Sequence, residues 1–301
     1  MKVTRDVIFT LSFGKTSDFR ALNVSFMKFR SLFALSLSLF LVFSCNSSKK
    51  SGLAGQAVVR MDSGQLALGG KLWSSLFEQR AAEYKALCIQ AFNIARLRLD
   101  EAIQQNASGK PMAIITDIDE TFLDNTPNSV HLALQGKDWD QQAWYDWTAR
   151  GTADTLSGAL AFYNYAASKH ITVFYITNRD EKDRSGTLNN LLKYQFPYSD
   201  NEHLIVRQAE SSKEERRQKV MANYQVVLLL GDNLADFSSL FDKKTEAERT
   251  DNVYRVANEF GKRFIVLPNA NYGGWEDALY ENKRWLLYQK DSIIKSKVKG
   301  Y

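Results

Sequence analysis

Five short apolar runs, separated by longer amphipathic stretches, most constrain the fold of this 301-residue chain. The runs are short enough for buried strands, and each stretch between them is long enough for a helix. Strands that are buried on both faces and alternate with helices indicate an open parallel sheet. The sequence therefore predicts an α/β fold, with a Rossmann-like parallel sheet and helices on both faces. The expected strands are residues 112–116, 171–177, 203–207, 226–231 and 263–268.

A helical segment is expected ahead of this sheet. From Lys71 to Asn106, small and apolar residues recur at helical spacing with charged residues between them. Residues 45–70 open with the polar stretch "NSSKKSG" and are expected to form a flexible tether. The folded domain is therefore expected over residues 71–301, with its N-terminal helices in 71–106. Cys88 is expected to be a small core residue.

Acidic, hydroxyl and amide side chains follow three of the five expected strands. Ligands of parallel sheets bind beyond the carboxyl ends of the strands, so these groups are expected to meet at one edge. Two carboxylates ~4 Å apart repel by about 4 kcal/mol at an effective dielectric constant near 20, which calls for a cation. A site made only of oxygen ligands suits Mg²⁺. The residues are Asp117 and Asp119 after the first strand, Thr177 and Asn178 after the second, and Asp232 and Asp236 after the fourth.

The segments "DIDET", "YITNRD" and "LLLGDNLADF" resemble motifs of the haloacid dehalogenase superfamily. Within it, the sequence is similar to the class C bacterial acid phosphatases of the lipoprotein-e type, whose four aspartates stand as DxDxT and GDxxxD. The resemblance covers about residues 71–300, with departures at Phe122 and Asn128. It implies the haloacid dehalogenase fold with a small, mainly helical cap region. It also implies a Mg²⁺-dependent phosphomonoesterase.

The resemblance implies roles for the residues of the first two motifs. Asp117 would be the nucleophile and form an aspartyl-phosphate. Asp119 would protonate the leaving oxygen and then activate the water that hydrolyses the intermediate. Thr177 and Asn178 would donate hydrogen bonds to phosphoryl oxygens.

The remaining roles are the metal site and a cation near the phosphate. Asp232 would bind Mg²⁺ together with Asp117 and the backbone carbonyl of Asp119, and Asp236 would act directly or through water. Lys213, in "SSKEERR", would neutralise Asp117 and the phosphate. Three nearby cations are alternatives to Lys213, namely Arg207, Arg216 and Arg217.

Acids outside these roles are expected to be structural. Glu120 and Asp124 would face solvent or shape the turn, and Thr121 would orient it. Asp180 suits a strand end because aspartate is a common turn residue.

Aromatic residues between the first two motifs and near the end could stack a nucleobase over the site. Such residues more often belong to a core. Trp147 and Tyr272 are the stacking candidates, and the expected partners are small phosphomonoesters, with 5′-nucleotides as natural substrates. The aromatic residues are Trp139, Trp144, Tyr145 and Trp147, then Tyr272 and Trp275.

The segment "MKFRSLFALSLSLFLVFSC" has two basic residues, an apolar run over residues 32–43, and then Cys45. The run is shorter than the ~20 residues of a membrane-spanning helix and is typical of a signal peptide, although a buried helix is the alternative. "VFSC" resembles a bacterial lipobox, which implies lipidation at Cys45, a signal region in residues 1–44 and a true start at Met27. The expected product is an exported lipoprotein held in the cell envelope by its lipid.

The net charge of +5 arises almost wholly within the first 44 residues, and the remainder holds 33 basic and 32 acidic residues. No nucleic-acid polymer is therefore expected as a partner. A binding or adhesion lipoprotein without catalysis, and a phosphotransferase, are the alternative functions. The oligomeric state is left open.

Overall fold

A parallel sheet of five strands lies at the centre of the computed structural model, which describes residues 65–106 and 109–301. The strand order is β5, β4, β1, β6, β7, and every neighbouring pair is parallel. This confirms the predicted α/β class and places the strand with the DxDxT motif in the middle. The strands are β1 (Met112–Thr116), β4 (Thr172–Ile176), β5 (Leu204–Ile205), β6 (Gln225–Gly231) and β7 (Phe264–Val266).

The pleat of the central strand divides the core into two parts. Ile114 of β1 belongs to one buried cluster, whereas its neighbours Ala113 and Ile115 belong to another. Alternate side chains of a strand point to opposite faces, so the two clusters lie on the two faces of the sheet. In β6 the register with β1 shifts by one residue near Val227, an irregularity of the bulge type.

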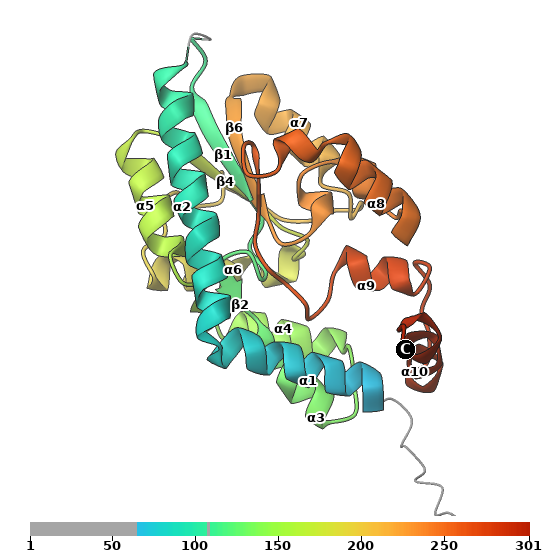
Figure 1. Ribbon diagram of the computed structural model, residues 1–301. Coiled ribbons are helices and arrows are strands. Elements are labelled where there is room, and N and C mark those ends of the chain that lie inside the picture. Colours follow the sequence, from blue (N-terminus) through green and yellow to red (C-terminus); the bar gives the residue numbers. More distant parts are fainter. Residues whose placement is uncertain (1–64, 107–108) are drawn as a thin grey trace, which may run out of the picture. The chain divides into compact units, whose positions relative to one another are not determined.

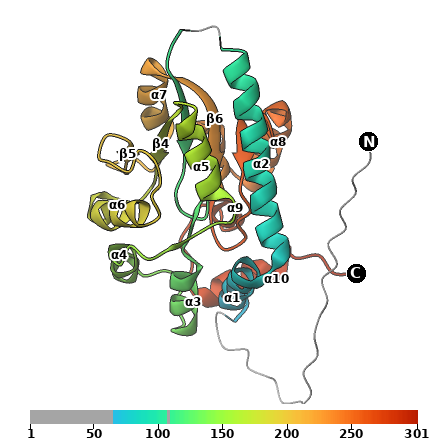
Figure 2. The same ribbon diagram turned by 90° about the vertical axis from the view of Figure 1, so that its left-hand side faces the viewer.

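Helices cover both faces of the sheet. α2 (Ala82–Gln104) and α5 (Ala159–Ser168) pack together over one face, and in Figure 2 they face the viewer. α7 (Glu214–Asn223) packs against β4 and β6 from the other side (Figure 1). Cys88 of α2 is fully buried, as expected of a small core residue.

The N-terminal helical segment differs from the prediction in its start. α1 (Gln65–Arg80) begins six residues before Lys71, and Ala81 separates it from α2. Its first turn is held from the far end of the chain, because the Ala67 N–H donates to Asp291 Oδ1 at 3.0 Å. Residues 65–70 are therefore helix and not tether.

The predicted signal region, the start at Met27 and the lipidation site at Cys45 lie outside the described residues. Within the described ranges, no helix has both the length and the apolar character needed to cross a bilayer.

A small, mainly helical cap region follows β1. It contains α3 (Thr126–Leu134), α4 (Gln141–Ala149) and an antiparallel pair, β2 (Leu123–Asp124) with β3 (Asp154–Thr155). α3 packs against α1 as well as α4, so the N-terminal helix supports the cap (Figure 1). The remaining α-helices of the described chain are α6 (Arg184–Lys193), α8 (Glu246–Arg255), α9 (Gly274–Leu279) and α10 (Leu287–Lys297).

Glu78 is a buried carboxyl where α1 meets the loop after β7. It is 6% exposed, and its Oε1 has no hydrogen-bond partner among the described residues. Burial, and then the charge of Asp124, raise the pKa of Glu78 to about 8, against the effect of a hydrogen bond from the Ala270 backbone. The side chain is therefore neutral in the fold at neutral pH.

We expect Glu78→Gln to flatten the pH dependence of stability. The folded-state pKa lies above the unfolded one, so this group stabilises the fold fully below pH 4.5 and loses that contribution as the pH rises towards 8. The loss amounts to about 1.4 kcal/mol per pH unit in that window. Urea unfolding at several pH values measures it. Equal slopes for the variant and the wild type would show that Glu78 is already charged in the fold.

Candidate active site

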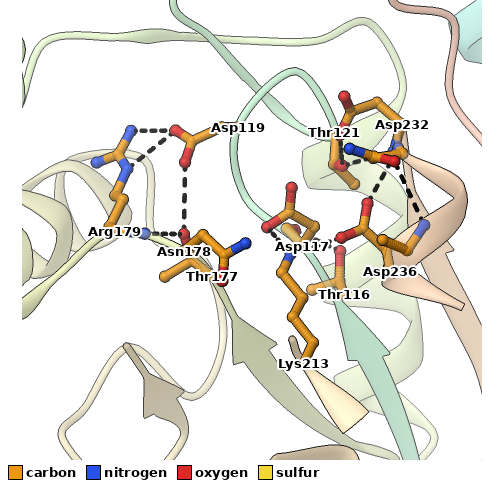
Figure 3. A network of polar contacts seen from close by, with 12 residues as sticks. Thr116, Asp117, Asp119, Thr121, Thr177, Asn178, Arg179, Lys213, Asp232 and Asp236 are labelled. Carbon is orange, nitrogen blue, oxygen red and sulfur yellow. Dashed lines mark hydrogen bonds and ion pairs between the residues drawn. The ribbon is translucent and has the colours of Figure 1, made fainter. Parts of the chain in front are cut away.

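A lysine and two aspartates form a buried ion-pair group at the carboxyl end of β1. Asp117 directly follows β1, and the Lys213 Nζ lies 2.5 Å from its Oδ1 and 2.6 Å from Asp236 Oδ1 (Figure 3). Burial lowers the pKa of Lys213, but the carboxylates of Asp117 and Asp236 raise it above its ordinary value. Burial also raises the pKa of Asp117, and Lys213 opposes that rise. The lysine is therefore charged and neutralises the candidate nucleophile.

The alternative cations do not reach Asp117. Arg216 donates to the Thr177 carbonyl at 2.6 Å, and Arg217 donates to the carbonyls of Ala235 and Asp236. The guanidinium of Arg207 lies 3.8 Å from Asp180. Among these four cations, Lys213 is thus the one that contacts the candidate nucleophile.

Three carboxylates form a candidate metal site beside this lysine. One oxygen from each of Asp117, Asp232 and Asp236 lies within 4.8 Å of the other two. Burial, and then the charges of Asp236 and Asp117, raise the pKa of Asp232 well above its ordinary value. A divalent cation would offset that repulsion. The donor set is all oxygen and therefore fits Mg²⁺.

Neighbouring side chains hold the metal-site carboxylates in place. Asp232 Oδ1 accepts from Thr121 Oγ1 at 3.1 Å, and its Oδ2 accepts from Asn269 Nδ2 at 2.8 Å. Asp236 Oδ2 accepts from the Asn233 N–H at 3.0 Å. These hydrogen bonds would hold the carboxylates in position for an ion.

Gly231, the last residue of β6, leaves room for Asp236. A Cβ at this position would lie 2.5 Å from both the Cβ and the Oδ2 of Asp236. Any side chain here would displace that carboxylate.

Asp119 lies apart from Asp117, Asp232 and Asp236, on the side of Thr177 and Arg179 (Figure 3). Its Oδ1 accepts from Arg179 Nη2 at 2.7 Å and Nε at 2.9 Å, and from Asn125 Nδ2 at 2.9 Å. Thr177 Oγ1 lies 3.4 Å from the other oxygen. Arg179 is only 2% exposed, so the acid is held by a buried guanidinium.

Thr177 and Asn178 of the second motif lie between Asp119 and Asp117 (Figure 3). Thr177 is buried, and its Oγ1 also accepts from the Arg179 N–H at 3.0 Å. The exposed Asn178 accepts at Oδ1 from Arg216 Nη2 at 2.7 Å. This bond turns the amide of Asn178 so that its NH₂ group is the donor left to bind an oxyanion.

A cavity of about 550 Å³ opens beside Asp119 and Asn178. Its lining includes three of the aromatic residues noted in the sequence, Trp139, Trp144 and Tyr272. Trp147, a predicted stacking residue, is not among the lining residues. Its ring packs against the main core cluster, and its Nε1 donates to Asn125 Oδ1 at 2.8 Å. The prediction for Trp147 therefore needs correction, because α4 turns Trp144 towards the cavity instead.

Two ion pairs between distant parts of the chain border the same cavity. Lys71 of α1 lies 3.3 Å from Glu276 of α9, and Lys290 of α10 lies 2.5 Å from Asp138 of the cap region. The cavity wall is thus assembled from the two ends of the described chain and the cap.

The acids expected to face solvent or shape the turn differ from each other. Asp124 is half-buried and accepts from the Thr126 N–H at 2.8 Å, so it shapes the start of α3 as expected. Glu120 is 1% exposed, which corrects the solvent-facing alternative. Its two oxygens accept from the Asn125 N–H and from the Tyr272 hydroxyl.

Sequence reasoning assigned no role to Arg179, Asn125 or Asn269. Arg179 stands next to Asn178 in "YITNRD", so the sequence could have predicted that Arg179 lies at the same edge of the sheet. Asn269 lies in a loop more than thirty residues after Asp232, and no local pattern connects the two.

A parallel sheet with a candidate nucleophile at the end of its central strand, a lysine on that nucleophile and a cap after the first motif define a haloacid dehalogenase-type protein. The family model described as HAD superfamily, subfamily IIIB (acid phosphatase), matches residues 42–275. The chain belongs to this family, which confirms the resemblance seen in its motifs.

Solved structures agree with this assignment. The class C acid phosphatase from Bacillus anthracis is 35% identical with a TM-score of 0.74, over 78% of this chain and 99% of that chain. Its structure with tungstate bound gives 35% identity and a TM-score of 0.75, over 79% and 99%. Acid phosphatase 1 of Solanum lycopersicum is 31% identical over 130 residues, which are 40% of this chain and 50% of the plant protein. The chain thus spans about half the length of this relative.

We expect Gly231→Ala to weaken metal binding, because the added methyl group displaces Asp236 from the three-carboxylate group. Calorimetric titration of the metal-free protein with Mg²⁺ should show an affinity for Mg²⁺ about 10- to 100-fold lower than that of the wild type. Gly69→Ala is the matched control, since a Cβ there meets nothing within 4 Å. An unchanged affinity in Gly231→Ala would argue against Asp236 as part of the metal site.

Proposed function

We propose that this protein is a Mg²⁺-dependent phosphomonoesterase that acts through an aspartyl-phosphate on Asp117. The observation that carries the proposal is the contact of Asp117 with Lys213, inside a group of three carboxylates at the end of the central strand. Family membership supports the same activity.

In this mechanism the Asp117 carboxylate attacks phosphorus, and the bond from phosphorus to the ester oxygen breaks. Asp119 donates a proton to the leaving oxygen, which as an alkoxide would leave poorly. The Asn178 NH₂ group and the Lys213 ammonium bind phosphoryl oxygens. Water then attacks the aspartyl-phosphate, with the Asp119 carboxylate as its general base, and releases inorganic phosphate.

The metal site fits this scheme. Asp117, Asp232 and Asp236 would hold Mg²⁺, with the backbone carbonyl of Asp119 as a further oxygen ligand. Bound Mg²⁺ supplies positive charge that offsets the negative charge of the phosphoryl group.

We expect Asp117→Asn to abolish hydrolysis of p-nitrophenyl phosphate, by at least about 10³-fold, because the amide cannot form the phosphoenzyme. EDTA should have the same effect on the wild type, and added Mg²⁺ should reverse it. Release of p-nitrophenolate measures both, with thermal unfolding as a check that the variant is folded. Turnover in Asp117→Asn would refute the aspartyl-phosphate. An inactive wild type across a broad phosphomonoester panel with Mg²⁺ would favour a binding or adhesion lipoprotein.

For the substrate we propose mononucleotides. The aromatic residues Trp139, Trp144 and Tyr272 line the cavity beside the phosphate-binding groups, and its volume accommodates a nucleoside. One solved relative binds tungstate, a tetrahedral oxyanion like phosphate, which supports the binding of a phosphate group by this chain.

We expect Trp139→Ala to raise KM for a 5′-nucleotide at least about fivefold, since one aromatic stack onto a base contributes ~1–3 kcal/mol. KM for glycerol 2-phosphate, which has no base, should change little. Trp275→Ala is the control, because Trp275 is exposed and borders a different pocket. Equal changes for both substrates would argue against base stacking at Trp139.

Export as a lipoprotein is part of the proposal and rests on the sequence around Cys45. Mass spectrometry of the N-terminus of the native protein tests it. A mature protein that retains residues 27–44 would contradict it.

A further inference from the structure

The Glu120 carboxyl is buried between two segments. One is the turn after β1 that carries Asp117 and Asp119, and the other is the loop after β7 that carries Tyr272. It is 1% exposed, and its backbone has a φ of 52°, in the left-handed region that side chains other than glycine seldom adopt. Such a conformation costs about 1–2 kcal/mol for an ordinary residue. A residue that is strained and carries a buried acid needs contacts that offset both costs.

Each carboxylate oxygen of Glu120 accepts a hydrogen bond, and the two donors lie in different parts of the chain. Oε1 accepts from the Asn125 N–H at 2.9 Å, where the chain enters α3. Oε2 accepts from the hydroxyl of Tyr272, in the loop after β7. One side chain therefore joins the turn after β1, the start of the cap and the cavity wall.

The first of these contacts leads on to the candidate acid. Asn125 is 1% exposed, and its Nδ2 donates to Asp119 Oδ1 at 2.9 Å. Its Oδ1 accepts from Trp147 Nε1 at 2.8 Å, so the amide orientation is fixed. Glu120 holds the backbone of Asn125, and Asn125 holds the carboxyl of Asp119.

The second contact leads to the substrate cavity. Tyr272 lines the cavity, and its backbone N–H lies 3.4 Å from Asn269 Oδ1. Asn269 in turn donates to Asp232 of the metal site at 2.8 Å. The same loop therefore carries a cavity wall residue and a partner of a metal-site carboxylate.

We propose that Glu120 is a positioning residue that sets the carboxyl of Asp119 against the leaving oxygen, through Asn125, while Tyr272 fixes the cavity wall to the same side chain. The inference rests on the proposed function, since it takes Asp119 as the general acid. A positioning defect then has its own kinetic signature. Esters with a poor leaving group need the proton, whereas p-nitrophenolate leaves without it.

The test compares kcat/KM for p-nitrophenyl phosphate with kcat/KM for glycerol 2-phosphate, whose leaving group is an alkoxide. Glu120→Ala should raise the ratio of the two at least about tenfold, because only the alkyl ester depends on the placed acid. Glu120→Gln should restore a ratio near the wild-type value, since its amide can accept from the Asn125 N–H and donate to the Tyr272 oxygen. If Glu120→Ala does not fold, Glu120→Asp makes the same comparison with a side chain too short to span both partners.

Two further variants separate the possible failures. Glu281→Ala removes an exposed acid that pairs with Lys283, away from Asn125 and Asp119, and it should leave the ratio unchanged. Asp119→Asn should raise the ratio by ~10²–10⁴. A wild-type ratio in Glu120→Ala beside a raised ratio in Asp119→Asn overturns the positioning role alone. A wild-type ratio in Asp119→Asn overturns the acid role itself.

Discussion

Repulsion between carboxylates is the constraint around which this structure is arranged. Asp117, Asp232 and Asp236 are brought within 4.8 Å of one another at the end of the sheet, and Asp117 and Asp236 are buried there. The ammonium of Lys213 bridges two of them, and a divalent cation would offset the rest. The strand order places β1 beside β6, and α7 brings the lysine to the same edge, so the fold delivers both signs of charge to one point.

Asp119 has the same chemical type but a different environment. It contacts the guanidinium of Arg179 and the amide of Asn125 rather than the lysine. Asp117 and Asp119 are two residues apart in the sequence, yet each contacts a different cation, Lys213 for Asp117 and Arg179 for Asp119. In the proposed mechanism, this division would let Asp117 act as the nucleophile and Asp119 exchange a proton.

The sheet and the candidate site could be predicted from the sequence to the extent that local patterns encode them. The apolar runs gave the five strands, and the acids directly after them share an edge because parallel strands end together. Long-range contacts could not be predicted in this way. The buried Glu120 accepts from Tyr272 of a distant loop, and the first turn of α1 donates to Asp291 near the other end of the chain. Trp144 and Trp147 lie three residues apart in α4, yet Trp144 lines the cavity whereas Trp147 Nε1 donates to Asn125, a long-range contact that composition does not reveal.

The assembly of the cavity has a consequence for how such a protein can change. The candidate catalytic groups all come from the ends of β1, β4 and β6 and from the start of α7, whereas α1, α9, α10 and the cap supply the two ion pairs at the border. α10 also lies beyond residue 275, where the family match ends. Substitutions in the peripheral helices can therefore change substrate preference while Asp117, Asp232 and Asp236 stay unchanged. This separation favours a family whose members share one reaction and differ in the substrates they prefer.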